Sequence, residues 1–393
     1  MNFSFSGKRL KEARLYNKMS ITELAEKLNI SKQMVSKYEN GLSAPTTEKS
    51  LLLNGILGYP REFFYSEENY TFKSKGTFFR SRLTATKKSK TPAEFLLKYS
   101  VVVRDFLDEY IEFPNLLDIS SSIAIPDRIS DSDIENITMS LREVLDLSNN
   151  PIDDMLEVIE LMGIVAVKFG YDEEKVDAFS SLTELNQNTY FIVVTGNTRS
   201  FFRQQFSLAH ELGHWVLHQD YVPEELSKEE YKLMEKEANK FASAFLLPAE
   251  KFGNDLKQMD LTLPNLLNLK KKWNVSIAAI IERGHQLGII TIDNKAQLYR
   301  KMNYHNWKNP EPLDEETPIS EPLALSQAIE LLIDENIFTG SEIKREIIEK
   351  YNLYISQKML AEVCNTSENI FNHKNKLELN LKMKNFNQNT GGE

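Results

Sequence analysis

The stretch FSLAHELGHWVLH, residues 206–218, constrains this chain more than any other segment, because it places His210 and His214 four residues apart with Glu211 between them. Four residues of α-helix advance about 400° and about 6 Å, so both imidazoles project from one face. Such a pair suits zinc, whose bonds to histidine nitrogen measure about 2.0–2.1 Å. Glu211, about 100° further round, can stand beside the ion and accept a proton from a bound water. The pattern H-E-x-x-H therefore predicts a metal site for hydrolysis.

The other residues of this stretch leave a plainer alternative open. The remaining helix face is apolar, which also suits a buried core helix that merely carries histidines. Gly213, between the two histidines, keeps that part of the helix surface slim. His218 lies one further turn along, and we expect it to support the site or lie on the surface rather than bind metal.

A catalytic zinc needs a third protein ligand and an open position. Cys364 is the only cysteine and is remote in sequence, so the ligand has to be His, Asp or Glu. The following helix offers four glutamates, namely Glu229, Glu230, Glu235 and Glu237. On a helical wheel Glu237 falls within the apolar arc, where a carboxylate without a partner would be costly. Glu235 lies near the other edge of that arc, so the wheel favours Glu237 by only a small margin.

Two segments together resemble a known family. RQQFSLAHELGHWVLH followed by EKEANKFASAFLLP is similar to the zinc metallopeptidases of the ImmA/IrrE family. VDAFSS at 176–181, the segment 141–167 and the helical pair after residue 269 extend the similarity over about residues 141–308. The resemblance implies that Glu237 is the third zinc ligand and Glu211 the general base. It also implies a zincin-like fold and cleavage of a helix-turn-helix repressor, which relieves repression of stress or mobile-element genes.

The N-terminal segment has the punctuation of short helices. Ser20 with Glu23 forms a capping box, Ser31 precedes a second helix, and Gly41 is a C-terminal stop. LAEKLNISKQMVSKYENG resembles the helix-turn-helix of XRE/Cro-type regulators, in which Ala25 lets two helices approach.

Charge supports an anionic partner for this end of the chain. Residues 1–90 hold 17 Lys and Arg against 8 Asp and Glu, whereas the remainder holds 30 against 49. The second helix of the motif is expected to enter the major groove of double-stranded DNA. The residues we expect to contact DNA bases or phosphates are Lys32, Gln33, Lys37, Asn40 and Lys8. The alternative for this domain is pairing with another protein.

The remaining boundaries follow from composition and periodicity. We expect an α+β, mostly helical chain, with an all-α N-terminal domain, a peptidase domain containing a small sheet, and a C-terminal helical module. Strands are predicted in IVAVKFG and TYFIVVTG, which are β-branched runs bounded by glycine. The expected organisation is a helix-turn-helix domain at 1–70, a basic linker at 71–93, the peptidase domain at 94–307, a proline-rich connection at 308–322, the helical module at 323–371 and a disordered tail at 372–393.

The sequence also bears on compartment and function. A single cysteine, no apolar leader and no long apolar run predict a cytoplasmic protein, and the DNA-binding motif type makes a homodimer possible. The leading hypothesis is a DNA-binding regulator whose zinc-dependent peptidase cleaves a repressor or this same chain. The rival hypothesis is a regulator or antitoxin-like protein whose metal domain is a non-catalytic sensor or interaction module.

Overall fold

The structure is a computed structural model that describes residues 5–65, 70–79, 87–126, 128–168, 178–196, 200–219, 221 and 225–372. The expected disordered tail, apart from Asn372, lies outside these residues. The α+β, mostly helical fold class is confirmed, because the described residues form seventeen α-helices around one four-stranded sheet. None of these helices combines the length and the uncharged apolar run that a membrane crossing requires.

The N-terminal domain is a bundle of four short α-helices followed by a 3₁₀ turn. Its elements are α1 (Gly7–Tyr16), α2 (Ile21–Leu28), α3 (Lys32–Glu39), α4 (Thr47–Leu57) and η1 (Arg61–Tyr65). The predicted capping box of Ser20 and Glu23 is present at the start of α2. Gly7 is required where α1 meets α3, because a Cβ there would lie 2.1 Å from the carbonyl oxygen of Tyr38.

The sheet has the strand order β1-β3-β4-β2, in which only β2 and β4 are parallel. Its strands are β1 (Phe72–Phe79), β2 (Val165–Lys168), β3 (Ala178–Leu185) and β4 (Asn188–Thr195). β2 and β4 confirm the two predicted strands. The prediction of a linker at 71–93 is wrong for its described parts, because β1 pairs with β3 and residues from Lys87 onward are helical. Lysines and helix breakers suggested a linker, but an edge strand tolerates both. Residues 80–86 lie outside the description.

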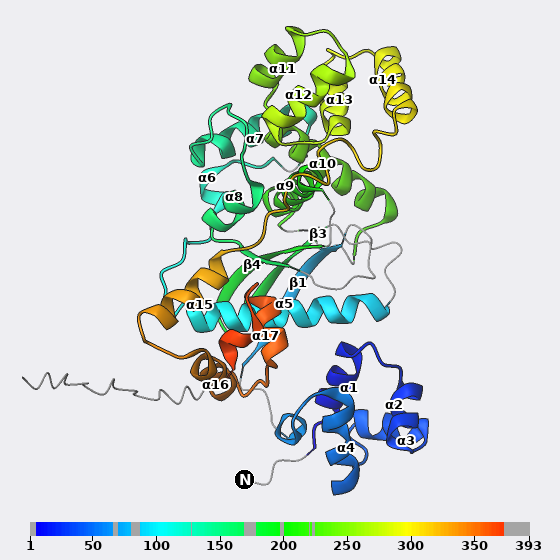
Figure 1. Cartoon of the computed structure of the whole chain (residues 1–393), viewed down its shortest axis with the longest axis vertical. Coiled ribbons are helices and arrows are strands. Elements are labelled where there is room, and N and C mark those ends of the chain that lie inside the picture. Colours follow the sequence, from blue (N-terminus) through cyan, green and yellow to red (C-terminus); the bar gives the residue numbers. More distant parts are fainter. Residues whose placement is uncertain are drawn as a thin grey trace, which may run out of the picture.

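Each face of the sheet has its own layer of helices, as Figure 1 shows. Ala166 and Val193 pack with one core, whereas Val165 and Val194 pack with the other, as the period of two in a strand requires. α9 (Phe201–Leu217) and α10 (Lys228–Leu246) belong to the first core. The other helices on that side are α6 (Ile119–Ser122), α7 (Asp131–Val144), α8 (Met155–Leu161), α11 (Ala249–Lys257), α12 (Leu263–Trp273), α13 (Ile277–Gln286) and α14 (Ile292–Tyr304).

The second core joins the C-terminal helices to the sheet. It contains α5 (Lys87–Leu107), α15 (Ala324–Asp334), α16 (Gly340–Tyr351), α17 (Gln357–Val363) and η2 (Glu368–Phe371). Asp105 of α5 links the layers by accepting hydrogen bonds from the hydroxyls of Tyr351 at 2.6 Å and Tyr190 at 2.9 Å. The expected separate C-terminal module is therefore part of the central domain, because its apolar faces cover α5 and one sheet face.

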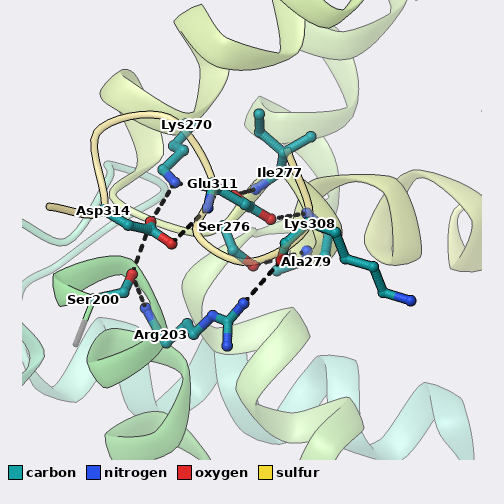
Figure 2. A network of polar contacts seen from close by, with 10 residues as sticks. Ser200, Arg203, Lys270, Ser276, Ile277, Ala279, Lys308, Glu311 and Asp314 are labelled. Carbon is teal, nitrogen blue, oxygen red and sulfur yellow. Dashed lines mark hydrogen bonds and ion pairs between the residues drawn. The ribbon is translucent and has the colours of Figure 1, made fainter. Parts of the chain in front are cut away.

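The proline-rich segment at 308–322 crosses from the α9 side of the sheet to the C-terminal helices. We call it the connecting segment. Its Glu311 and Asp314 both accept hydrogen bonds from Lys270 of α12, and all three side chains are buried (Figure 2). Glu311 also accepts hydrogen bonds from two backbone amides at the start of α13, and Asp314 from Ser200, which caps α9. A segment that the sequence predicted only as an extended connection is thus anchored to three helices.

The N-terminal domain contacts the C-terminal helices through Tyr354. The ring of Tyr354 lies edge-on to Tyr59 and Phe63 with centroids 5.8 and 6.4 Å apart. Arg9 of α1 donates a 2.8 Å hydrogen bond to the carbonyl of Asn352. This interface places α1 beside the central domain, while α3 lies on the far side of the bundle in Figure 1.

Candidate metal centre and DNA-binding surface

The H-E-x-x-H motif lies in the middle of α9, which is buried along almost its entire length. Packing between the sheet and α10 explains why this helix has little polar surface. His210, Glu211 and His214 are each only 1% exposed. Burial of three polar side chains in about one helical turn costs free energy unless they have hydrogen-bond or metal partners. Their contacts therefore indicate what this site can bind.

Close packing of α9 against α10 brings the third carboxylate to the histidines. A Cβ on Gly213 would lie 3.0 Å from Cδ1 of Phe241 and 3.2 Å from its Cβ and Cγ. Real Cβ contacts of this length are uncommon, so with a larger residue here Phe241 would have to shift by a few tenths of an ångström. The absence of a side chain at Gly213 therefore lets α10 approach the histidine turn.

Three side chains meet between the helices. Nε2 of His210 and Nε2 of His214 are 3.1 Å apart. Oε2 of Glu235 lies 3.5 Å from the His210 nitrogen, and its Oε1 lies 3.5 Å from the His214 nitrogen. Bonds of about 2.0–2.1 Å to a tetrahedral zinc would place two ligand atoms about 3.3 Å apart. The three separations lie close to that value, so His210, His214 and Glu235 form a set that could hold a zinc ion.

The structure does not place Glu237, the third ligand that the resemblance implies, beside the two histidines. Glu237 does not face His210 and His214; its Oε2 lies 3.0 Å from Nε2 of His218. Glu235 and Glu237 are two residues apart, about 200° around α10, so they cannot both face the same histidines. The wheel placed Glu237 correctly in the buried arc. The partner of this buried carboxylate is His218.

The ionisation states of this cluster suit a metal. Burial lowers the pKa of His214 to about 3, and the neighbouring His210 and His218 lower it further against the opposing effect of Glu235. Burial acts to raise the pKa of Glu235, but the facing imidazoles of His210 and His214 outweigh that effect and hold the pKa well below its usual range. Neutral imidazole and ionised carboxylate are the forms that bind metal.

Glu211 is held from the opposite side by the sheet. Its Oε2 accepts a 2.5 Å hydrogen bond from the hydroxyl of Ser180 on β3, and Ser180 is fully buried. None of the sequence motifs indicated a role for this serine. A signal was present, because Ser180, Ser181 and Thr183 lie in a strand with buried apolar residues, and buried hydroxyls need partners.

Two adjoining hollows lie beside the candidate metal site. One, of about 440 Å³, is bordered by Phe206 of α9, by Asn239 and Gln286, and by residues at the start of α13. The other, of about 510 Å³, is bordered by Glu235, Asn239 and Gln286. Because they share Asn239 and Gln286, the two hollows adjoin beside α10, and we call them together the groove along α10; Glu235 borders it.

The predicted DNA contacts fall in two places. Lys32, Gln33 and Lys37 are exposed on α3, and Asn40 is exposed at its end, where its amide donates to the Ser36 carbonyl. Lys8, in contrast, borders a hollow with Phe95 and Lys98 of α5. The structure therefore brings four of the five residues together on α3 and places Lys8 at the boundary with the central domain.

Comparison with known families agrees with both resemblances. Residues 159–285 match the model of the IrrE N-terminal-like domain, a peptidase family, and residues 10–64 match a helix-turn-helix model. A Mycobacterium tuberculosis transcriptional regulator of known structure is similar at 16% identity, over 47% of this chain and 50% of that chain, with a TM-score of 0.29. No curated protein matches the chain.

The matches define a class of protein, namely one that joins a helix-turn-helix domain to a domain of a peptidase family. Within that class, this chain joins an XRE-type helix-turn-helix domain to an ImmA/IrrE-like domain, as the sequence predicted.

Proposed function

We propose that this protein is a transcriptional regulator whose central domain is a zinc-dependent peptidase acting on a helix-turn-helix repressor or on this same chain. The carrying observation is the spacing of His210, His214 and Glu235, which matches tetrahedral zinc coordination. The groove along α10 supports the proposal because it offers room for an extended peptide beside these residues.

The residues of the chain divide the chemistry between them. Bound zinc would supply Lewis acidity, which polarises a scissile carbonyl and acidifies a water. Glu211 takes a proton from the attacking water and delivers it to the leaving amine. Ser180 holds the carboxylate of Glu211 in one orientation through its hydrogen bond. Asn239 and Gln286, on the groove wall, offer amides that can bind a peptide backbone.

DNA binding is assigned to α3. Lys32 and Gln33 occupy its exposed N-terminal turn, the part of a recognition helix that reaches base edges. Glutamine can bind adenine with two hydrogen bonds, and lysine can bind guanine or phosphate. Lys8 is not part of this assignment, because it borders the central domain.

The proposed reaction is tested with the full-length chain, purified without chelators and supplied with zinc. It is incubated with candidate helix-turn-helix repressors, and both repressor and enzyme are followed by mass spectrometry. We expect cleavage that stops on chelation and in Glu211→Gln, whose zinc content stays equal to that of the wild type. Glu229→Gln, the same change at an exposed position of α10, serves as the control and is expected to cleave normally.

One observation favours the second candidate, a domain in which the metal is not catalytic. Both histidines and Glu211 are almost fully buried, and among the three ligands only Glu235 has appreciable exposure, at 19% of its side chain. In that case zinc would stabilise the domain, or the domain would act as a metal sensor. Repressors that stay intact with zinc-loaded protein would support it, and cleavage by Glu211→Gln would remove Glu211 as the base.

A further inference from the structure

A row of buried side chains leads away from the candidate metal ligands, and it consists of His214, His218 and Glu237. Nδ1 of His214 lies 3.2 Å from Nδ1 of His218, and Nε2 of His218 lies 3.0 Å from Oε2 of Glu237. His218 is fully buried and Glu237 is 8% exposed. The row therefore runs from the metal-facing imidazole to a carboxylate on α10 through one intermediate imidazole.

The position of each proton in this row follows from hydrogen-bond chemistry. A carboxylate can only accept, so Glu237 requires a proton on Nε2 of His218. A neutral imidazole carries one proton, which leaves Nδ1 of His218 as an acceptor. The facing Nδ1 of His214 then has to be the donor. As a result, Nε2 of His214 carries the lone pair, and this is the nitrogen that faces His210 and Glu235.

We propose that Glu237 and His218 are positioning residues, which fix His214 in the tautomer and ring orientation that binds metal. This inference rests on the proposed metal site and assigns a role to two residues outside the ligand set. Without the row, His214 has a competing choice, since a proton on its Nε2 could be donated to Glu235 3.5 Å away. That tautomer would block the metal-binding nitrogen.

The two candidate histidine ligands, His210 and His214, differ in whether a second residue orients the imidazole ring. Nδ1 of His210 is buried and has no hydrogen-bond partner among the described residues. Metal-binding histidines usually donate their second N–H to a carboxylate, a carbonyl or water, and removal of that partner typically weakens metal affinity about 10–100-fold. His214 is thus the ligand whose geometry the protein controls most tightly.

The first experiment measures zinc affinity of the full-length protein by competition with a chromophoric chelator. We expect Glu237→Leu to weaken zinc binding about 10–100-fold. Glu237→Gln keeps an oxygen that can accept from His218, so its affinity stays closer to that of the wild type. Glu229→Leu, the same change at an exposed position of α10, is the matched control and is expected to bind zinc normally.

The second experiment reads the tautomer directly in the metal-free protein. Histidine labelled with ¹⁵N distinguishes protonated from unprotonated ring nitrogens by NMR, and the chain has only six histidines to assign. We expect His214 to be protonated on Nδ1 in the wild type and to shift toward protonation on Nε2 in Glu237→Leu. A purely structural role of Glu237 would leave this signature unchanged.

The outcomes separate this inference from the proposed function. Zinc bound equally well by wild type and a folded Glu237→Leu would overturn the positioning role and leave the metal site intact. Wild-type protein that holds no zinc would overturn the metal site, and the NMR measurement would still decide the tautomer. If Glu237→Leu does not fold, protonation of His214 on Nε2 in the wild type is sufficient to refute the inference.

Discussion

The substitution Lys270→Met tests whether the connecting segment is held by its buried charges. Nζ of Lys270 lies 3.0 Å from a Glu311 oxygen and 2.7 Å from an Asp314 oxygen. Each carboxylate keeps other donors when the lysine is lost, because Glu311 accepts from the amides of Ile277 and Ala278 and Asp314 accepts from Ser200 (Figure 2). What remains is nevertheless two buried negative charges for which the described part of the chain shows no other ion-pair partner.

The magnitude follows from this arrangement. Two charge-assisted hydrogen bonds contribute about 1.5–3 kcal/mol each, and removing one partner of a buried ion pair costs about 3–5 kcal/mol. Methionine fills a similar volume, so no large cavity adds to the cost. We expect a loss of about 3–5 kcal/mol in the free energy of unfolding, which corresponds to a fall of about 6–20 °C in melting temperature for a domain of this size.

Thermal unfolding followed by circular dichroism measures this effect, with Lys271→Met as the matched control. Lys271 is the next residue of α12 and is exposed, so the same change there is expected to leave the melting temperature near that of the wild type. Equal melting temperatures for the two variants would refute the reasoning, since the buried cation would then contribute nothing. Partial rescue of Lys270→Met by Glu311→Gln would support it further.

Three further predictions concern the base, the sheet and the DNA surface. Ser180→Ala should lower the rate of cleavage about 10-fold or more with unchanged zinc content, because Glu211 loses its orienting hydrogen bond; an unchanged rate would exclude that role. The pKa of Asp105 is lowered, since hydrogen bonds led by that from Tyr351 outweigh the effect of burial. A carboxyl group with a lowered folded-state pKa stabilises the fold above its unfolded value of about 3.9 and loses that contribution as pH falls. Asp105→Asn should therefore cost about 1.5–3 kcal/mol at neutral pH, and denaturant unfolding should show the deficit closing below about pH 4; a deficit independent of pH would contradict this cause. In gel-shift titrations, Lys32→Ala with Gln33→Ala should weaken binding to operator DNA at least 10-fold, whereas Lys8→Ala should not; the reverse order would place the DNA surface on α1.

Features that depend on local sequence were predictable. The capping box at Ser20, the strands β2 and β4, and the helical spacing of His210 and His214 all arise from residues a few positions apart. Conformational preferences of neighbouring residues set these features, such as a capping side chain at a helix start or β-branched residues in a strand, so a pattern in one segment is sufficient to predict them. The linker prediction failed because β1 depends on a distant segment. This strand forms through its pairing with β3, about a hundred residues later.

The candidate site divides along the same line. By itself, the sequence predicted that two imidazoles share one face of a helix and that a glutamate from the next helix joins them. Only the tertiary structure decided that Glu235 faces His210 and His214 while Glu237 contacts His218, and that Ser180 donates to Glu211. The choice depends on the rotation of α10 about its own axis relative to α9. That rotation is set by side-chain packing such as Phe241 against Gly213, which periodicity within either helix does not encode.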